Sequence, residues 1–154
     1  PTETFRREFL QRGVLGLGPT GTIIKREAFE AVGCFTGTRY IGDTELWYKL
    51  AMLYPVVKMV PGLIYWRQHD DQEITKGQES FFYLENAYKL QLDVLNKSNL
   101  PVNQSERTKA LKKVNRRFSR NLFRLIKEGG FKTASKMRKD LQLSWIEIII
   151  NLKK

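Results

Sequence analysis

Cysteine and histidine are almost missing from this chain, which has one of each, Cys34 and His69, among 154 residues. A single cysteine excludes an internal disulfide and favours a reducing compartment such as the cytosol. One cysteine and one histidine also exclude the Cys and His ligand sets of a structural zinc site. No pattern in the sequence pairs His69 with the thiol, so we interpret Cys34 as a structural cysteine and not as a nucleophile.

Long apolar runs are also missing. The most apolar stretch, residues 146–152, is much shorter than the roughly 18 residues that a membrane-spanning helix needs. Hydrophobic residues still make up 42% of the chain, which is too much for a disordered protein and enough for a packed core. The chain starts at Pro1 without a signal-peptide pattern, and we interpret it as a cytosol-facing piece of a longer protein.

Negative charge is scarce in the second half of the chain. The formal net charge is +11, and residues 97–139 carry fourteen Lys and Arg against two Glu, so this stretch accounts for the whole excess. The shift in charge predicts two regions, residues 1–76 and residues 77–154, of which the second is a basic helical extension.

Residue spacing predicts short elements first and long helices later. Clusters of β-branched residues favour strands, and these are expected over residues 21–26, 56–60 and 63–67. Apolar spacing at helical periods and flanking Gly or Pro predict helices over residues 26–32, 43–54, 79–95, 103–128, 131–141 and 144–152. The spacing of Asn103 and Glu106 is that of a capping box at a helix start.

Residues 18–74 carry an ordered set of short motifs. They are Gly21 before Lys25-Arg26, Val32-Gly33-Cys34-Phe35, Gly42-Asp43-Thr44-Glu45-Leu46-Trp47, Val60-Pro61, and Tyr65-Trp66-Arg67-Gln68-His69. In this order and spacing the stretch resembles the C-terminal part of the catalytic domain of family 2 glycosyltransferases. The resemblance implies a mixed α/β fold, namely the acceptor-side half of a GT-A nucleotide-diphospho-sugar transferase, followed by the basic helices. Two positions depart from the family pattern, since Gly42 replaces a Glu and Cys34 replaces a Gly.

The same resemblance implies a function. Family 2 enzymes transfer a sugar from a nucleotide-sugar donor to an acceptor hydroxyl, and polysaccharide or cell-surface glycan synthesis is the expected setting. A divalent cation, Mn or Mg, is implied in the complete enzyme. The nucleotide-binding strands and the metal-binding Asp-x-Asp of the family are not found in this sequence, so the chain alone is expected to be inactive.

Asp43 matches the family's general base. A hydroxyl is a poor nucleophile at neutral pH, so a carboxylate within hydrogen-bond reach is what the reaction requires. Because Asp43 stands at the start of a predicted helix, it also suits an N-cap, where a carboxylate accepts backbone N–H groups and favours the helix dipole. The local sequence leaves both interpretations open.

Four further residues are implied to bind substrate, and these are Gly21, Trp47, Trp66 and Arg67. Either tryptophan can stack on a sugar ring or pack in the core. Arg67 can pair with a phosphate or form a structural ion pair. Gly21 ends a glycine run that lacks the flanking strand and helix of a dinucleotide site, so we interpret the run as an acceptor-side loop.

His69 is the implied metal ligand, or a neighbour of the donor diphosphate, in the complete enzyme. Imidazole is an acceptable ligand for manganese. The alternative is a surface histidine at a strand end. The adjacent Asp70 and Asp71 are in the wrong place along the chain for the family's Asp-x-Asp, and we interpret them as a solvated turn.

The alternative to a glycosyltransferase is a non-enzymatic basic helical module that binds anionic membrane or nucleic acid, because the basic stretch over residues 103–140 predicts a partner of opposite charge. A basic amphipathic helix can lie on an anionic membrane, here on the inner face, although a solvated surface has the same composition. Nucleic acid is a less favoured partner because neither helix-turn-helix nor zinc spacing is present. An exposed edge of the incomplete sheet would also favour a homodimer.

Overall fold

The computed structural model describes the chain except for residues 12, 17, 60, 61, 63, 64, 66, 68, 73–80, 129 and 154. The elements are α1 (Thr2–Phe5), the π-helix η1 (Arg6–Leu10), the 3-10 helix η2 (Pro19–Gly21), α2 (Arg26–Ala31), α3 (Gly42–Leu53), α5 (Phe82–Leu95), α6 (Gln104–Lys127), α7 (Phe131–Asp140) and α8 (Trp145–Lys153). The described residues form no strand. The predicted mixed α/β GT-A architecture is therefore wrong, and this part of the chain is all-helical.

The residues expected to form strands remain irregular where they are described. Residues 22–25 connect η2 to α2 with Ile23 almost fully exposed, and residues 55–59 follow α3 with Val57 exposed. Much of the third expected strand, residues 63–67, lies outside the described residues. A β-branched run becomes a strand only when a neighbour pairs with its backbone and covers one face. Neither described segment has such a neighbour, so the sheet edge on which a homodimer was predicted is absent there.

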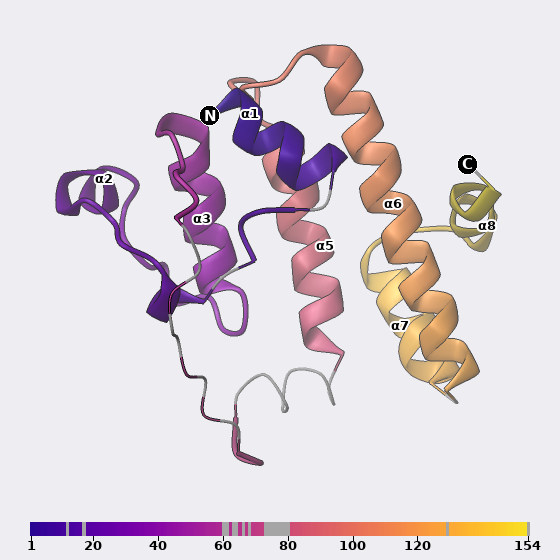
Figure 1. Cartoon of the computed structure of the whole chain (residues 1–154). Coiled ribbons are helices and arrows are strands. Elements are labelled where there is room, and N and C mark those ends of the chain that lie inside the picture. The colour runs from indigo at the N-terminus through magenta and orange to yellow at the C-terminus, as the bar shows by residue number, and fades with distance from the viewer. Residues whose placement is uncertain are drawn as a thin grey trace.

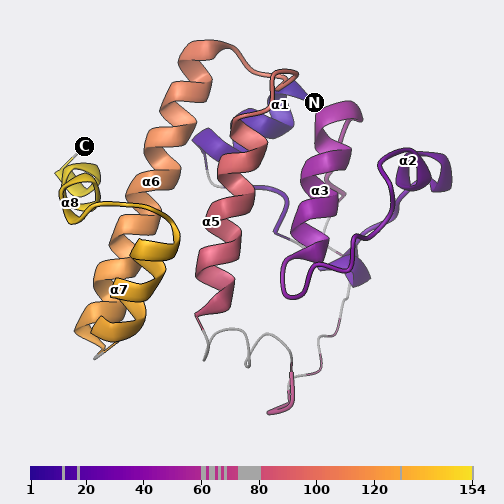
Figure 2. The ribbon, with the colours of Figure 1, turned by 180° about the vertical axis from the view of Figure 1, so that it is seen from behind.

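Three helices, α3, α5 and α6, stand side by side in that order, and both views agree on this row (Figures 1 and 2). α2 lies at the outer edge of the row beyond α3, and α8 lies at the opposite edge beyond α6. α5 and α6 run antiparallel, as is usual for helices joined by a short connection.

The N-terminal helical segment bridges the row, because α1 contacts α3 while η1 contacts α6. Phe5 and Phe9 of this segment are buried, and the Phe9 ring lies 5.3 Å from that of Tyr48 in α3. The Glu8 carboxylate of η1 accepts the N–H groups of Val14 and Leu15 at 2.7 and 3.0 Å. Burial, and next the charge of Glu8, raises the pKa of the Tyr48 phenol well above its ordinary value.

The core is built around α6, the longest of the described helices. Val114, Phe118 and Leu122 recur every four residues and form a buried apolar stripe, as the apolar spacing over residues 103–128 predicted. The Phe118 ring stacks on Tyr88 of α5 with 4.0 Å between centroids. The Tyr88 hydroxyl donates to Asn115 Oδ1 at 2.9 Å, so the buried phenol keeps a hydrogen-bond partner.

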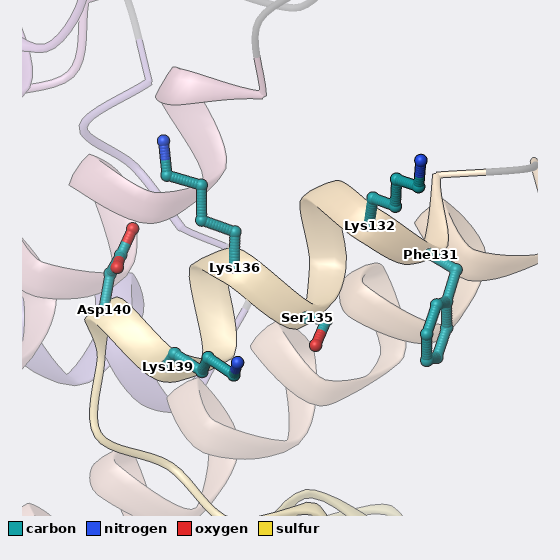
Figure 3. A pocket seen from close by; sticks show the side chains of 6 residues that line it. All are labelled: Phe131, Lys132, Ser135, Lys136, Lys139 and Asp140. Atoms are coloured by element: carbon teal, nitrogen blue, oxygen red, sulfur yellow. The ribbon is translucent and has the colours of Figure 1, made fainter.

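α7 and α8 both pack against α6. The first residues of the two helices also contact each other. The rings of Phe131 and Trp145, which open the two helices, stack with 6.2 Å between centroids. The Arg138 guanidinium lies 5.3 Å from the Trp145 ring centre. Lys132 and Lys136 are exposed and extend to the same side of α7, opposite to the ring of Phe131 (Figure 3).

The turn after α2 uses two consecutive residues in the left-handed region. Gly33 has φ of 83° and Cys34 has φ of 57°. Their N–H groups donate to the carbonyls of Glu30 and Phe29, which closes the end of the helix. Glycine adopts this conformation freely, whereas for a residue with a Cβ atom the left-handed conformation is about 1–2 kcal/mol higher in energy. The backbone of Cys34 is therefore strained.

Cys34→Gly is expected to raise the free energy of unfolding by about 0.5–1 kcal/mol, because relief of the left-handed strain exceeds the added entropy of the unfolded chain. Denaturant titration measures the change. The matched control is Glu30→Gly within α2, which should lower stability by about 1 kcal/mol, as glycine does in helices. A loss of stability in both variants would contradict the strain at Cys34.

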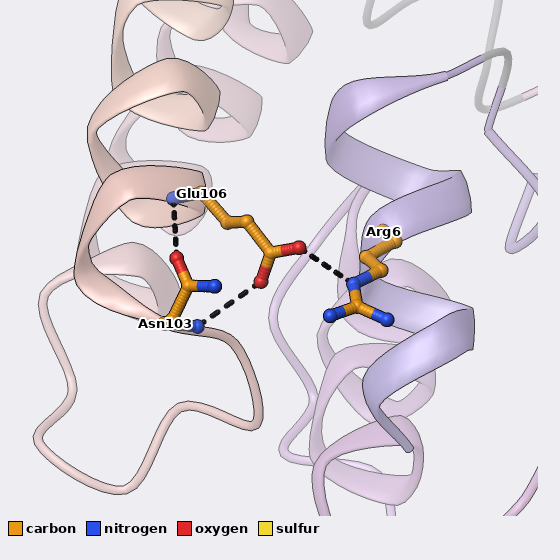
Figure 4. Close-up of polar contacts among 3 residues, drawn as sticks. All are labelled: Arg6, Asn103 and Glu106. Carbon is orange, nitrogen blue, oxygen red and sulfur yellow. Dashed lines mark hydrogen bonds and ion pairs between the residues drawn. The ribbon is translucent and has the colours of Figure 1, made fainter.

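The predicted capping box at the start of α6 is confirmed. Asn103 Oδ1 accepts the N–H of Glu106 at 2.9 Å, and Glu106 Oε2 accepts the N–H of Asn103 at 3.1 Å (Figure 4). Glu106 Oε1 also lies 2.6 Å from Nε of Arg6, which ties the N-terminal segment to α6. The Arg6 guanidinium first, and then the Asn103 N–H, holds the pKa of Glu106 below its ordinary value of 4.5.

The lowered pKa of Glu106 makes stability pH-dependent in a defined direction. The carboxylate contributes stability at neutral pH, and this contribution is lost as the pH falls below 4.5, because the unfolded chain takes up the proton first. Glu106→Gln is therefore expected to be less stable at pH 7 and to lose less stability than the natural chain on acidification. Urea titrations at neutral and acid pH check this. Glu3→Gln, which removes an exposed ion pair with Arg7, is the control. It should change little either the stability at pH 7 or the stability lost on acidification. An equal loss on acidification in Glu106→Gln and the natural chain would contradict the prediction.

Candidate functional site

Asp43 lies in the first turn of α3, with its side chain half-buried. The N-cap position is Ile41, and no side chain caps this helix. Asp43 Oδ1 instead accepts the N–H of the adjacent Thr44 at 2.6 Å. The capping alternative for Asp43 is therefore not what the structure shows. A carboxylate in the first helical turn is still favoured by the helix dipole.

Glu45, the second acid of the same turn, is held in place by three neighbours. Its Oε2 accepts the hydroxyls of Thr36 at 2.5 Å and Thr38 at 2.9 Å, and its Oε1 lies 2.9 Å from Nζ of Lys49. Burial raises the pKa of Glu45, but the Thr36, Lys49 and Thr38 contacts outweigh it, so the net pKa is lowered. Glu45 anchors the loop before α3 to the helix.

An aromatic pair flanks the same loop. Tyr40 has φ of 68°, and its ring meets that of Phe82, the first residue of α5, edge to face at 5.4 Å. The Arg39 guanidinium lies 4.8 Å above the Tyr40 ring. A non-glycine residue in the left-handed region costs of order 1–3 kcal/mol and is common where a loop is shaped for binding. Aromatic faces suit sugar rings, and a guanidinium suits phosphate.

Sequence reasoning missed the roles of Glu45, Tyr40 and Phe82. The Glu45–Lys49 pair has the i,i+4 spacing that is readable from sequence. The hydroxyl contacts of Glu45 and the ring contact of Tyr40 depend on how the loop folds back on α3 and α5, and no local pattern carries that information.

The predicted substrate-binding residues lie on separate segments. Trp47 is part of the core, with 6% of its surface exposed. Gly21 is exposed at the end of η2, and Arg67 is exposed beyond α3, where its carbonyl accepts Nε2 of Gln72 at 2.5 Å. Trp66 lies outside the described residues.

His69 is exposed and precedes a turn that contains Asp70 and Asp71, which agrees with the solvated turn expected there. The His69 carbonyl accepts the N–H of Gln72 at 3.3 Å. In the part of the chain that the structure describes, no three His, Cys, Asp or Glu side chains are grouped to hold a metal. These residues do not by themselves fit a divalent-cation site, and the metal role of His69 stays a prediction.

Comparison with protein-family models, curated proteins and solved structures finds no match for this chain. The resemblance to family 2 glycosyltransferases thus rests on the motifs of residues 18–74. Among the described helices, none combines the length and the apolar character needed to cross a membrane.

Proposed function

We propose that this chain supplies the acceptor side of a nucleotide-sugar glycosyltransferase, in which Asp43 is the general base. The observation that carries the proposal is that the two carboxylates in the first turn of α3 have different contacts. Glu45 is engaged by Thr36, Thr38 and Lys49 and holds the loop, whereas the Asp43 carboxylate is bonded to its chain neighbour Thr44 and is half-exposed. The motif order of residues 18–74 supplies the reaction type.

The chemistry follows from this placement. Asp43 accepts the proton of the acceptor hydroxyl as the hydroxyl oxygen bonds to the anomeric carbon of the donor. The bond between that carbon and the donor's diphosphate oxygen breaks, and the nucleoside diphosphate leaves with the electron pair. Tyr40 and Phe82 present aromatic surface near the start of α3, where an acceptor sugar ring can stack. Arg39 supplies a positive charge beside them.

Sugar transfer by the natural full-length protein tests the proposal. A panel of nucleotide sugars labelled in the sugar is offered with hydroxyl acceptors, and product is compared between the natural sequence and Asp43→Asn. The matched control is Asp93→Asn, which removes an exposed carboxylate from the outer side of α5. Equal turnover in the natural protein and Asp43→Asn would refute Asp43 as the base.

A further inference from the structure

α8 has two apolar sides, and one of them is uncovered. Ile148 belongs to the core with 1% of its surface exposed, and α8 packs against α6. On the other side Ile146, Ile149 and Ile150 are 70%, 44% and 44% exposed. At 100° per residue these three side chains fall within one third of the helix circumference. Three neighbouring isoleucines in water form the kind of apolar surface that marks a contact site.

The apolar surface continues onto α7. Phe131 is 57% exposed and stacks on Trp145, which stands one turn before Ile149 on α8. We call Phe131, Ile146, Ile149 and Ile150 the apolar patch.

Positive charge lies beside the apolar patch. Phe131 shares one shallow hollow on α7 with three lysines, Lys132, Lys136 and Lys139, as well as Ser135 and one acid, Asp140 (Figure 3). Lys153 is exposed on α8. We call Lys132, Lys136 and Lys139 the α7 lysines. Glu147, the acid in the first turn of α8, makes a hydrogen bond at the helix start, where its Oε2 accepts the N–H of Ser144 at 2.7 Å.

We propose that the apolar patch and the α7 lysines together bind the surface of an anionic phospholipid bilayer. The isoleucines and Phe131 enter the boundary between headgroups and acyl chains, while the lysines reach lipid phosphates through their long aliphatic stems. Each Lys near an anionic surface strengthens binding about fivefold. The contact is thus centred on α7 and α8, and not along the length of α6 as the charge distribution alone suggests. It does not depend on the chemistry of Asp43.

Charge distinguishes this occupant from the alternatives. A second copy of the chain would bring two molecules of net charge +11 together with their α7 lysines beside the same interface, and like charges oppose such contact. The phosphates of a nucleic acid would bind the lysines, but the three isoleucines would remain without a partner. Single strands stack on aromatic side chains, and duplex phosphates are bound by positive charge alone. An anionic bilayer can contact the apolar patch through its acyl chains and the α7 lysines through its phosphates.

Vesicle co-sedimentation of the whole chain tests the proposal. The chain is expected to bind vesicles of phosphatidylcholine with about one third phosphatidylglycerol, and to bind pure phosphatidylcholine at least tenfold more weakly. Ile146→Ser combined with Ile149→Ser and Ile150→Ser should weaken binding at least tenfold. The matched control is Ile23→Ser, which changes an equally apolar and almost fully exposed residue far along the chain and should have no effect.

A second pair of variants separates a local site from net charge. Lys132→Gln, Lys136→Gln and Lys139→Gln together should weaken binding about a hundredfold. The same loss of three charges at Lys97, Lys109 and Lys112 should weaken it less than fivefold.

Equal losses in the two triple variants, equal binding to neutral vesicles, or a full effect of Ile23→Ser would overturn the proposal. Tighter binding to duplex DNA than to anionic vesicles, or a dimer in sedimentation that the isoleucine variant abolishes, would overturn it in favour of those partners. Far-ultraviolet circular dichroism checks that every variant stays folded.

Discussion

Asp43→Asn is expected to lower kcat for sugar transfer by the natural full-length protein about 10²–10⁴-fold, which is the usual contribution of a positioned general base. The amide keeps the size and shape of the side chain and can still bond to Thr44, but it cannot accept the hydroxyl proton. The KM for the acceptor should change little, because the lost interaction develops in the transition state. Initial rates measured across acceptor concentrations separate the two constants.

Glu45→Gln is the informative comparison because it lies in the same turn. This variant weakens the bonds that hold Thr36 and Thr38 and removes the ion pair with Lys49. We expect it to loosen the loop before α3, and so to raise KM and lower thermal stability more than it lowers kcat. If Glu45→Gln lost more kcat than Asp43→Asn, the roles of the two carboxylates would have to be exchanged.

The helices of the second region could be predicted from sequence because their signals are local. Asn103 and Glu106 cap α6 through contacts three residues apart, and the stripe through Phe118 repeats every four residues. These patterns act within one or two turns of helix, so the sequence contains all the information that they need. The bounds of α5, α6, α7 and α8 agree with the predictions within a few residues.

The first region was harder to predict because its structure depends on distant partners. Ile23 and Val57 sit in β-branched runs, yet strand formation requires a paired neighbour that local sequence does not specify. The N-terminal segment was missed although Phe5 and Phe9 have helical spacing, since nine residues form a stable helix only when tertiary contacts support them. At the candidate site the motif pointed to Asp43, but the loop held by Glu45 became visible only in three dimensions.

Phe118→Ala is expected to lower the free energy of unfolding by about 3–5 kcal/mol, the usual cost of removing a buried aromatic ring. The ring is 3% exposed and stacks on Tyr88, so its loss leaves a cavity between α5 and α6 and removes a ring contact. Urea denaturation followed by circular dichroism gives the change. A domain of this size has a total stability of about 5–15 kcal/mol, so the variant should be partly unfolded in moderate urea.

Phe131→Ala is the matched control because it removes the same side chain from a site where 57% of it is exposed. It should cost about 1 kcal/mol or less, mostly from the lost stack on Trp145. Tyr88→Phe keeps the ring stack between α5 and α6 and removes only the hydrogen bond to Asn115. It should lower the free energy of unfolding by about 1 kcal/mol. If Phe118→Ala cost no more than Phe131→Ala, α6 would not be the centre of the core. The α5–α6 pairing would then have to be held by its polar contacts and by the N-terminal segment.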